Sequence, residues 1–543
     1  MLTCLILLLI SDKIIASSNV KISTPLGEIL GSTILKSRAG RTIYSFRGIR
    51  YAQPPIDDLR FQPPVPITIW SGVYDATNDG PACPQPPNPG ITFPTSEDCL
   101  YLNVYTPKLP SKQEKVKLPV IIYLHGGGFI IGTARSDVFG PQFLLDEDIV
   151  LVVVNYRLAT FGFISVNENV PGNNGLKDQV VAMKWTKKYI SAFGGDPNSI
   201  TLFGFSAGSC SANLHLVSPM SRNLFNKAII SSCSVLGPLP LPSHQLDLAR
   251  KQARLVGCPD DNPEEILSCL RTKSADEIVN TFPQFNEFAN NPTLIWLPVI
   301  EKDYGQKRFL TEHPIKSVVK HRFQDVPILS GIVKDEFADN AAVIINNPSL
   351  LKELDDNFDK WGPVIFLYER GTNRSKEISR QVRKFYLGDG PLNNASLHGL
   401  ENAFMDALIG FATNRLVGLF SLYGRRKVYY YEFTYHELNN TDLVMHGTDQ
   451  LYLFYTPALA AVYPSLPNLN VSNKMVHLWS NFAKFGNPNG AGDNNGIVDW
   501  KPYNRVTKKY LDIGDNFVLR NNLRQERYAF WRKLYPIDIC LKH

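Results

Sequence analysis

The sequence predicts an α/β fold in which one mostly parallel sheet is covered by helices on both faces. Apolar runs rich in β-branched and aromatic residues recur along the chain, with helical segments between them. Most of these runs are continuously apolar, which is typical of parallel strands buried on both faces. The six strongest runs are residues 120–124, 149–155, 200–205, 227–232, 326–331 and 428–433.

Weaker patterns predict the edge of the sheet and one of its helices. Residues 20–51 alternate more between apolar and polar side chains, so we expect antiparallel strands there, at the sheet's edge. Residues 174–193 predict a helix that packs on the sheet through an apolar stripe. The stripe consists of residues at helical spacing, namely Leu176, Val180, Met183 and Ile190.

Two long segments interrupt the alternation of strand and helix. Residues 236–320 and 340–414 are polar, helix-rich and broken by proline and glycine. We interpret both as helical insertions that cap the sheet and shape the pocket for a small molecule. Because strands and helices otherwise alternate, we expect residues 19–543 to form a single α/β domain.

The composition indicates a globular protein and argues against nucleic-acid binding. With 44% hydrophobic and 20% charged residues, the chain of 543 residues can bury a large core. Its net charge of +6 is spread thinly over 56 Lys and Arg and 50 Asp and Glu, without a dense basic run. A nucleic-acid partner is therefore not expected.

The amino-terminal segment predicts a cleavable secretory signal peptide at residues 1–18. Residues 1–10 are apolar but too few to span a bilayer, and the small residues Ala16, Ser17 and Ser18 follow. The segment lacks Lys or Arg before its apolar core, so a buried amino-terminal strand is the alternative. No long apolar stretch follows Trp531, and we expect a secreted protein without a membrane span.

Secretion would place the cysteines in an oxidising compartment, where pairing is expected. Cys83 and Cys99 bracket a proline-rich loop, and Cys258 and Cys269 bracket a short polar one. Both loops close easily, so we expect each pair to form a disulfide, although spacing alone does not determine connectivity.

The other cysteines of the mature chain have no obvious mates. Cys210 and Cys233 lie in apolar elements and are expected to be buried thiols. Cys540, near the carboxyl end, could bridge two chains, and the oligomeric state is left open.

Secretion also makes N-x-Ser/Thr sequons candidate glycosylation sites. Four sequons without proline in the middle position begin at Asn373, Asn394, Asn439 and Asn470.

The run Gly-Phe-Ser-Ala-Gly at residues 204–208 indicates a nucleophilic serine. It follows an expected strand directly, and glycine at both ends permits a sharp turn into a helix that exposes Ser206. The pattern G-x-S-x-G also arises by chance in roughly one chain in five of this length. Ser206 therefore needs a base, an acid that orients the base, and donors for an oxyanion.

A glycine-rich loop supplies the expected oxyanion donors. The strand that ends at residue 124 leads into His-Gly-Gly-Gly at residues 125–128, which resembles the oxyanion loop of lipases and esterases. A phosphate-binding loop would require Gly-Lys-Ser/Thr or G-x-G-x-x-G, and neither is present here. The amide of Ala207, next to the nucleophile, is expected to be the second donor.

The acid and the base are expected after the serine, in that order. Asp335 and Glu336 follow the strand at residues 326–331, and spacing does not separate them from Asp339. His446 lies in the loop after residues 428–433, and His436 is its rival because it lies closer to that strand.

Four sequence blocks distinguish this chain from other hydrolases. They read Phe-Arg-Gly-Ile-Arg-Tyr-Ala at 46–52, Glu-Asp-Cys-Leu-Tyr-Leu-Asn-Val-Tyr at 97–105, Asn-Tyr-Arg at 155–157 and Phe-Gly-Gly-Asp-Pro at 193–197. From about residue 20 to residue 535 the chain resembles the type-B carboxylesterases, the family of cholinesterases, liver-type carboxylesterases and insect esterases. The resemblance implies an α/β-hydrolase fold with helical caps and a secreted hydrolase of carboxylic esters.

The resemblance also implies roles for individual residues. It assigns Ser206 as nucleophile, Glu336 as acid and His446 as base of an acyl-serine mechanism. It further implies oxyanion amides at Gly127, Gly128 and Ala207, and disulfides Cys83–Cys99 and Cys258–Cys269. A small-molecule ester is the expected partner, and the mechanism needs no cofactor or metal.

The chain departs from the family at two positions, and alternatives remain open. The family usually has glycine where Phe337 follows the acid, and often has glycine at Cys233. Juvenile-hormone-type esterases usually have glutamine where Phe205 stands. Cholinesterases carry a tryptophan in the region of residues 86–90, where this chain has no aromatic residue. This difference argues against choline esters as the substrate. A non-catalytic adhesion protein of the same family would lack the nucleophile.

Overall fold

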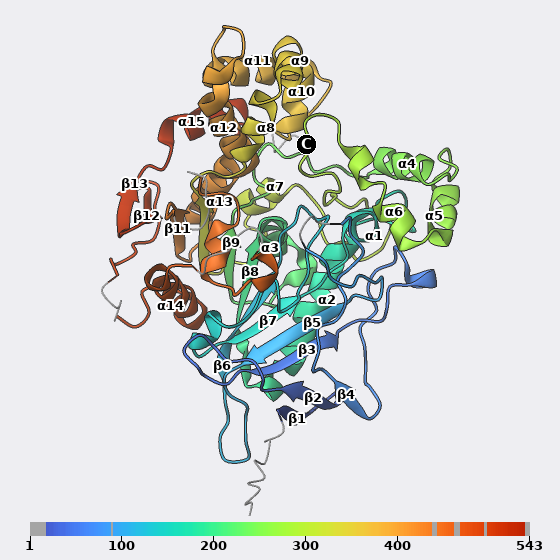
Figure 1. The fold of residues 1–543 in the computed structure, drawn as a ribbon, viewed down its shortest axis with the longest axis vertical. Helices are drawn as coiled ribbons and strands as arrows, with labels where there is room; N and C mark the ends of the chain where they lie inside the picture. Colours follow the sequence, from blue (N-terminus) through green and yellow to red (C-terminus); the bar gives the residue numbers. More distant parts are fainter. Residues whose placement is uncertain (1–17, 88–90, 437–442, 461–466, 493–496, 538–543) are drawn as a thin grey trace, which may run out of the picture.

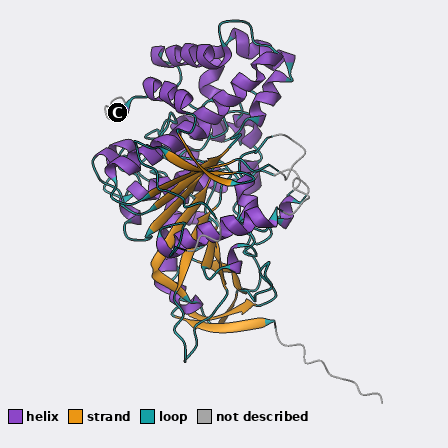
Figure 2. Ribbon diagram, turned by 90° about the vertical axis from the view of Figure 1, so that its left-hand side faces the viewer, coloured by secondary structure: helices purple, strands orange, loops and turns teal. Residues whose placement is uncertain are grey.

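The chain folds around one large sheet with helices on both faces (Figures 1 and 2). The computed structural model describes residues 18–87, 91–436, 443–460, 467–492 and 497–537. Within these residues 13 strands form the sheet, in the order β1-β2-β3-β5-β7-β6-β8-β9-β10-β11-β12-β13, with β4 beside β2. The predicted α/β architecture is confirmed.

The centre of the sheet is parallel from β7 to β12. Six of its strands correspond to the predicted apolar runs, and β12 was not predicted. The strands are β6 (Leu118–Leu124), β7 (Val150–Val154), β8 (Gly195–Phe205), β9 (Lys227–Ser231), β10 (Ile328–Val333), β11 (Val428–Phe433) and β12 (Lys509–Ile513). The strand β10 begins two residues later than predicted, because Pro327 has no N–H for the ladder and pairing with β11 starts at Ile328.

Both edges of the sheet are mainly antiparallel, and residues 20–51 predict this for one of them. One edge consists of β1 (Asn19–Thr24), β2 (Gly27–Ser32), β3 (Tyr44–Arg50) and β5 (Tyr101–Thr106). The short strand β4 (Val73–Asp75) runs parallel to β2, and β13 (Phe517–Asn521) closes the other edge against β12.

Successive residues of the central strands enter two separate hydrophobic cores. Along β6, Ile122 and Leu124 belong to one core, whereas Ile121 and Tyr123 belong to the other. Helices α2 (Asn174–Tyr189), α3 (Ala207–Val217) and α13 (Phe411–Tyr423) pack in the first core, and α14 (Leu469–Phe485) packs in the second. Burial on both faces explains why these strands are continuously apolar.

Most of the remaining helices lie in the two predicted insertions, and α1 and α15 lie outside them. The predicted helix at residues 174–193 is α2 followed by a 3-10 turn at Ile190–Phe193. The others are α1 (Ala159–Phe163), α4 (Leu246–Leu255), α5 (Pro263–Thr272), α6 (Ala275–Val279), α7 (Pro314–Val319), α8 (Asp339–Ile345), α9 (Pro348–Asp356), α10 (Phe358–Ile365), α11 (Asn373–Leu387), α12 (Leu397–Met405) and α15 (Gln525–Leu534).

The first insertion is helical only in part. Helices α4 to α6 form one lobe beside the sheet, and α8 to α12 form a second lobe (Figure 1). Residues 286–313 contain no helix, contrary to the prediction for this part of 236–320. Pro292 and Pro298 interrupt this stretch, because proline lacks the N–H that a helix needs.

One helical stretch of the described residues, Asn394–Tyr423, is apolar and long enough to cross a membrane. However, 83% of its apolar window is buried inside the protein. It therefore packs as a core element, with α13 against β10 and β11.

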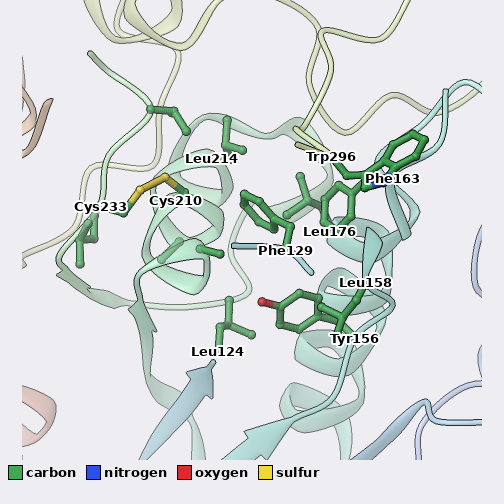
Figure 3. Packing of buried hydrophobic residues seen from close by; sticks show 14 of the residues in the cluster. Leu124, Phe129, Tyr156, Leu158, Phe163, Leu176, Cys210, Leu214, Cys233 and Trp296 are labelled. Carbon is green, nitrogen blue, oxygen red and sulfur yellow. A yellow bond between two sulfur atoms is a disulfide. The ribbon is translucent and has the colours of Figure 1, made fainter. Parts of the chain in front are cut away.

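The described residues contain three disulfides, and one of them corrects a prediction. The expected pairs Cys83–Cys99 and Cys258–Cys269 are both formed. Cys210 and Cys233, expected to be thiols, form a third disulfide between α3 and the segment after β9 (Figure 3). The two cysteines are 23 residues apart in sequence, but the fold brings their Cα atoms to within 5.3 Å of each other. Both cysteines are buried, as predicted.

The Cys210–Cys233 disulfide gives a first testable prediction. Replacing both cysteines by serine is expected to lower the free energy of unfolding by about 2–4 kcal/mol, measured by urea denaturation. In the wild-type protein, peptide mapping without reductant is expected to recover the two cysteines in one linked peptide pair. Alkylation of both residues in denatured, unreduced protein would contradict the disulfide.

Several predictions concern positions at the surface or outside the described residues. Asn373, Asn394 and Asn470 are exposed, which is compatible with glycan attachment. Asn439, Cys540 and residues 1–17 of the expected signal peptide lie outside the described residues.

Candidate active site

Ser206 occupies a sharp turn between β8 and α3. Its backbone has φ 53° and ψ −122°, in a region that L-residues rarely adopt. A Cβ at position 204 would lie 2.0 Å from the carbonyl oxygen of Gly208, and a Cβ at position 208 would lie 2.0 Å from that of Leu124. Only glycine fits at these two positions, as the G-x-S-x-G pattern predicts, and the turn leaves Ser206 half-buried.

Ser206, His446 and Glu336 form a continuous chain of hydrogen bonds. The Ser206 hydroxyl lies 2.8 Å from Nε2 of His446, and Nδ1 of the same ring donates to Oε2 of Glu336. Glu336 is fully buried after β10, and its Oε1 accepts the backbone N–H of Val333 at 3.0 Å. His446 follows Ser206 by 240 residues and Glu336 by 110 in the sequence, and the fold brings the three side chains into direct contact.

The structure distinguishes the alternatives that spacing left open. Asp335 points to the loop that leads to His446, where its Oδ2 accepts the backbone N–H of Val444 at 2.8 Å. Asp339 is exposed at the start of α8, and His436 is exposed beyond the end of β11. Of these acids and histidines, Glu336 and His446 are therefore the pair that lies next to Ser206.

Three backbone amides beside Ser206 have no hydrogen-bond acceptor among the described residues. They belong to Gly127, Gly128 and Ala207, the residues expected to bind an oxyanion. Ala207 is the first residue of α3, where helix N–H groups lack an intrahelical partner. Gly127 has φ 106°, and a Cβ there would lie 2.0 Å from the carbonyl oxygen of Ile131, so the loop requires glycine.

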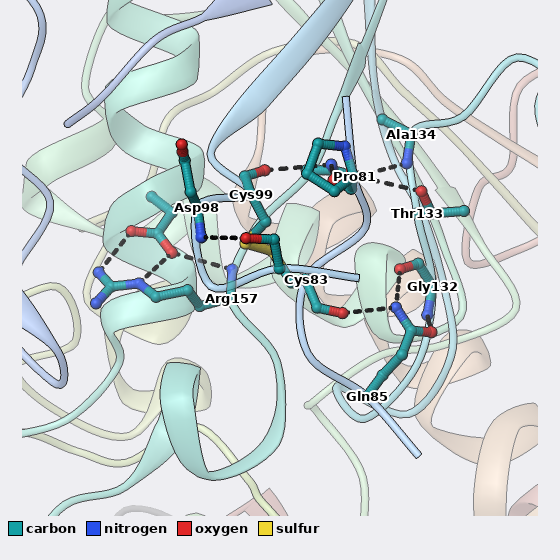
Figure 4. Close-up of a disulfide and its surroundings, with 12 residues drawn as sticks. Pro81, Cys83, Gln85, Asp98, Cys99, Gly132, Thr133, Ala134 and Arg157 are labelled. Atoms are coloured by element: carbon teal, nitrogen blue, oxygen red, sulfur yellow. Dashed lines mark hydrogen bonds and ion pairs between the residues drawn. A yellow bond between two sulfur atoms is a disulfide. The ribbon is translucent and has the colours of Figure 1, made fainter. Parts of the chain in front are cut away.

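The loop that follows the glycines is held by the segment between Cys83 and Cys99 (Figure 4). Nε2 of Gln85 donates to the carbonyl oxygen of Gly132 at 2.9 Å, and the N–H of Gly132 donates to Oε1 of Gln85 at 2.9 Å. The disulfide thus fixes the segment that carries Gln85 and its two hydrogen bonds to Gly132. Sequence reasoning did not single out Gln85.

Comparison with known proteins identifies the family. The family model described as "Carboxylesterase family" matches residues 17–531. The chain belongs to the carboxylesterase family. It is accordingly a carboxylic-ester hydrolase with an α/β-hydrolase fold, as the sequence blocks imply.

Relatives of this carboxylesterase include several named insect esterases. It is 35% identical to a juvenile hormone esterase of Tribolium castaneum, over 95% of this chain and 94% of the relative. It is also 35% identical to esterase FE4 of Myzus persicae, over 92% and 89%. A carboxylic ester hydrolase of Bombus ignitus is 32% identical, over 95% and 94%.

Two compartments of the carboxylesterase meet at Ser206. A wide one of about 470 Å³ contains the glycine loop and His446, with Phe139, Phe282 and Leu451 among its walls. A narrow one of about 30 Å³ lies on the side of Ala207 and Cys233. The residues that line both are Ser206, Thr293, Leu294 and Phe337. Of these, Thr293 and Leu294 come from the first insertion, which was expected to shape the pocket.

Asp449 is a buried carboxyl behind Ser206 to which the sequence assigned no role. Its Oδ2 accepts the hydroxyls of Tyr431 at 2.8 Å and Ser231 at 2.9 Å, while its Oδ1 has no partner among the described residues. Burial raises the pKa of Asp449. The carbonyl of Ser231 accepts the N–H of Ser206 at 2.9 Å, so this network supports the turn from below. Its position three residues after His446 is the signal that could have indicated it.

His125, at the start of the glycine loop, is neutral near physiological pH. Burial lowers its pKa to about 4. Its Nδ1 donates to the carbonyl oxygen of Gly126 at 2.8 Å, and its ring stacks on Tyr156 with a centroid distance of 4.4 Å.

The described residues contain no group of three or more His, Cys, Asp or Glu side chains arranged to hold a metal ion.

Proposed function

We propose that this carboxylesterase cleaves carboxylic esters through an acyl-serine intermediate on Ser206. The observation that carries the proposal is the hydrogen-bonded chain from Ser206 through His446 to the buried Glu336, beside amides without acceptors. A serine hydroxyl is a weak nucleophile unless a base removes its proton, and this arrangement supplies the base and the group that orients it.

The reaction follows from these positions. Nε2 of His446 takes the Ser206 proton as Oγ attacks the ester carbonyl, and Glu336 stabilises the resulting imidazolium. The amides of Gly127, Gly128 and Ala207 donate to the oxyanion. His446 then protonates the leaving alcohol, and it later activates the water that releases the acid.

The compartments favour a neutral, apolar ester. Apart from His446, no ionisable side chain occurs among the described residues that line them. A cationic or anionic substrate group would lose its hydration there without a charged partner. The different sizes of the compartments favour an ester with one large and one small group.

A juvenile hormone ester is the second candidate substrate, supported by the similarity to the Tribolium enzyme of that name. Phe205 argues against it, because juvenile-hormone-type esterases usually have glutamine there. A non-catalytic adhesion role is disfavoured, because Ser206, Glu336 and His446 are all present and in contact.

We further propose that the signal peptide at residues 1–18 is removed and that residues 19–543 are secreted as one catalytic domain. Three disulfides support it, because such bonds persist in oxidising compartments. Exposed sequons at Asn373, Asn394 and Asn470 are compatible with passage through the secretory pathway. Amino-terminal sequencing of the protein from the medium tests the cleavage near Ser18.

The pH dependence of hydrolysis tests the role of His446. The kcat for an aryl ester is expected to fall steeply from about pH 8 to about pH 5, because protonated His446 cannot accept the Ser206 proton. The buried histidines His125 and His215 do not account for such a fall, since burial lowers their pKa values to about 4 and about 3. A flat kcat over this range, with chemistry rate-limiting, would contradict the mechanism.

A further inference from the structure

We propose that Phe337 is a positioning and specificity residue, whose ring orients His446 and separates the two compartments at Ser206. The inference rests on the proposed function, because it assigns a role within the same site. The backbone of Phe337 has φ 53°. This left-handed region favours glycine, and a bulky side chain there is uncommon and unfavourable. Such strain persists where the surrounding structure holds the residue in place.

The ring of Phe337 packs on the imidazole of His446. The ring centroids lie 4.3 Å apart with an interplanar angle of 27°. Phe205 packs on the same imidazole at 5.0 Å and 31°. Neither phenyl ring offers a conventional hydrogen bond, so both restrict the imidazole through ring packing.

The orientation of the imidazole matters because His446 makes hydrogen bonds to Ser206 and to Glu336 at the same time. A rotation of the ring would lengthen the bond from Ser206 to Nε2, the bond from Nδ1 to Glu336, or both. Only 16% of the His446 side chain is exposed, so water has little access to the ring. Packing by Phe337 therefore favours the orientation in which both hydrogen bonds are made.

Phe337 also forms part of the boundary between the compartments. It is one of the few residues that line both of them, together with Ser206, Thr293 and Leu294. The narrow compartment has a volume of only about 30 Å³. Removing the phenyl ring would join this space to the wide compartment and admit a larger substrate group beside Ser206.

The test compares kcat and KM of Phe337→Gly, Phe337→Asn and Phe337→Tyr with those of the wild type. The substrates are p-nitrophenyl esters of increasing acyl length and phenylacetate esters of increasing alcohol size. Glycine and asparagine tolerate the left-handed backbone but lack the ring, whereas tyrosine retains it. Val343→Ala, at an exposed position on α8, is the control that leaves basal activity unchanged.

We expect Phe337→Gly and Phe337→Asn to lower kcat for the smallest ester by about 10- to 100-fold with little change in KM, because a misplaced base slows the chemical step. Both variants are also expected to shift the preference towards larger groups, by about tenfold. Their midpoints of thermal unfolding should change little, because relief of the backbone strain offsets part of the lost ring packing. Phe337→Tyr is expected to retain most of kcat.

Two results would overturn the proposal. One is a wild-type kcat and an unchanged ester preference in Phe337→Gly. The other is a loss of kcat that follows a loss of thermal stability in all three variants. Failure of the proposed function is distinguishable, because the wild-type enzyme would then not hydrolyse the esters or form an adduct at Ser206.

Discussion

Replacing Ser206 with alanine is expected to lower kcat for a simple aryl ester by about a million-fold. Alanine fits the turn but has no oxygen to attack the carbonyl, so the acyl intermediate cannot form. The residual rate would come from the oxyanion amides and from substrate binding. The measurement is the initial rate of p-nitrophenyl acetate hydrolysis by purified, folded protein.

The matched control is Ser209→Ala on the same helix. The Ser209 hydroxyl donates to the carbonyl of Cys233 at 2.8 Å and forms no hydrogen bond with His446. This variant is expected to stay within a few-fold of the wild-type kcat. A Ser206→Ala protein with more than about one hundredth of the wild-type activity would exclude Ser206 as the nucleophile.

Replacing Glu336 with glutamine is expected to lower kcat by about ten-thousand-fold. The amide has nearly the same shape and retains an acceptor for the N–H of Val333. It cannot stabilise the imidazolium as a carboxylate does, and it permits the wrong tautomer of His446. The protein is therefore expected to fold normally, as circular dichroism would show, while losing its activity.

Asp339→Asn provides the comparison for Glu336→Gln. Asp339 is three residues further along the chain and exposed, so its replacement is expected to leave kcat unchanged. If Glu336→Gln retained activity within tenfold of the wild type, the acid of the proposed mechanism would have to be another residue.

The sequence predicted most of the sheet because burial on both faces leaves a continuous apolar run. The strand β12 was missed because its residues Lys509 and Asp512 interrupt such a run near the sheet's edge. The Cys210–Cys233 disulfide was missed for a different reason. It depends on two elements meeting across the sheet, and sequence spacing contains no information on that contact.

The sequence predicts those parts of the candidate site that depend on neighbouring residues in the chain. It does not predict which of several nearby side chains points towards Ser206. The turn at Ser206 requires glycine at fixed positions, so its pattern is visible in the sequence. Glu336 and Asp335 both follow β10, and only the fold shows that one meets His446 while the other binds the loop at Val444. Asp449 lies three residues after His446 in the sequence, but its burial and its contacts with Ser231 and Tyr431 become visible only in the fold.

Covalent labelling of the nucleophile tests the assignment of Ser206. The wild-type enzyme is incubated with diisopropyl fluorophosphate until activity is lost, then digested and analysed by tandem mass spectrometry. We expect one adduct per chain, on Ser206, and no adduct in Ser206→Ala treated in the same way. Complete loss of activity with Ser206 unmodified, or with the adduct on another residue, would contradict this assignment.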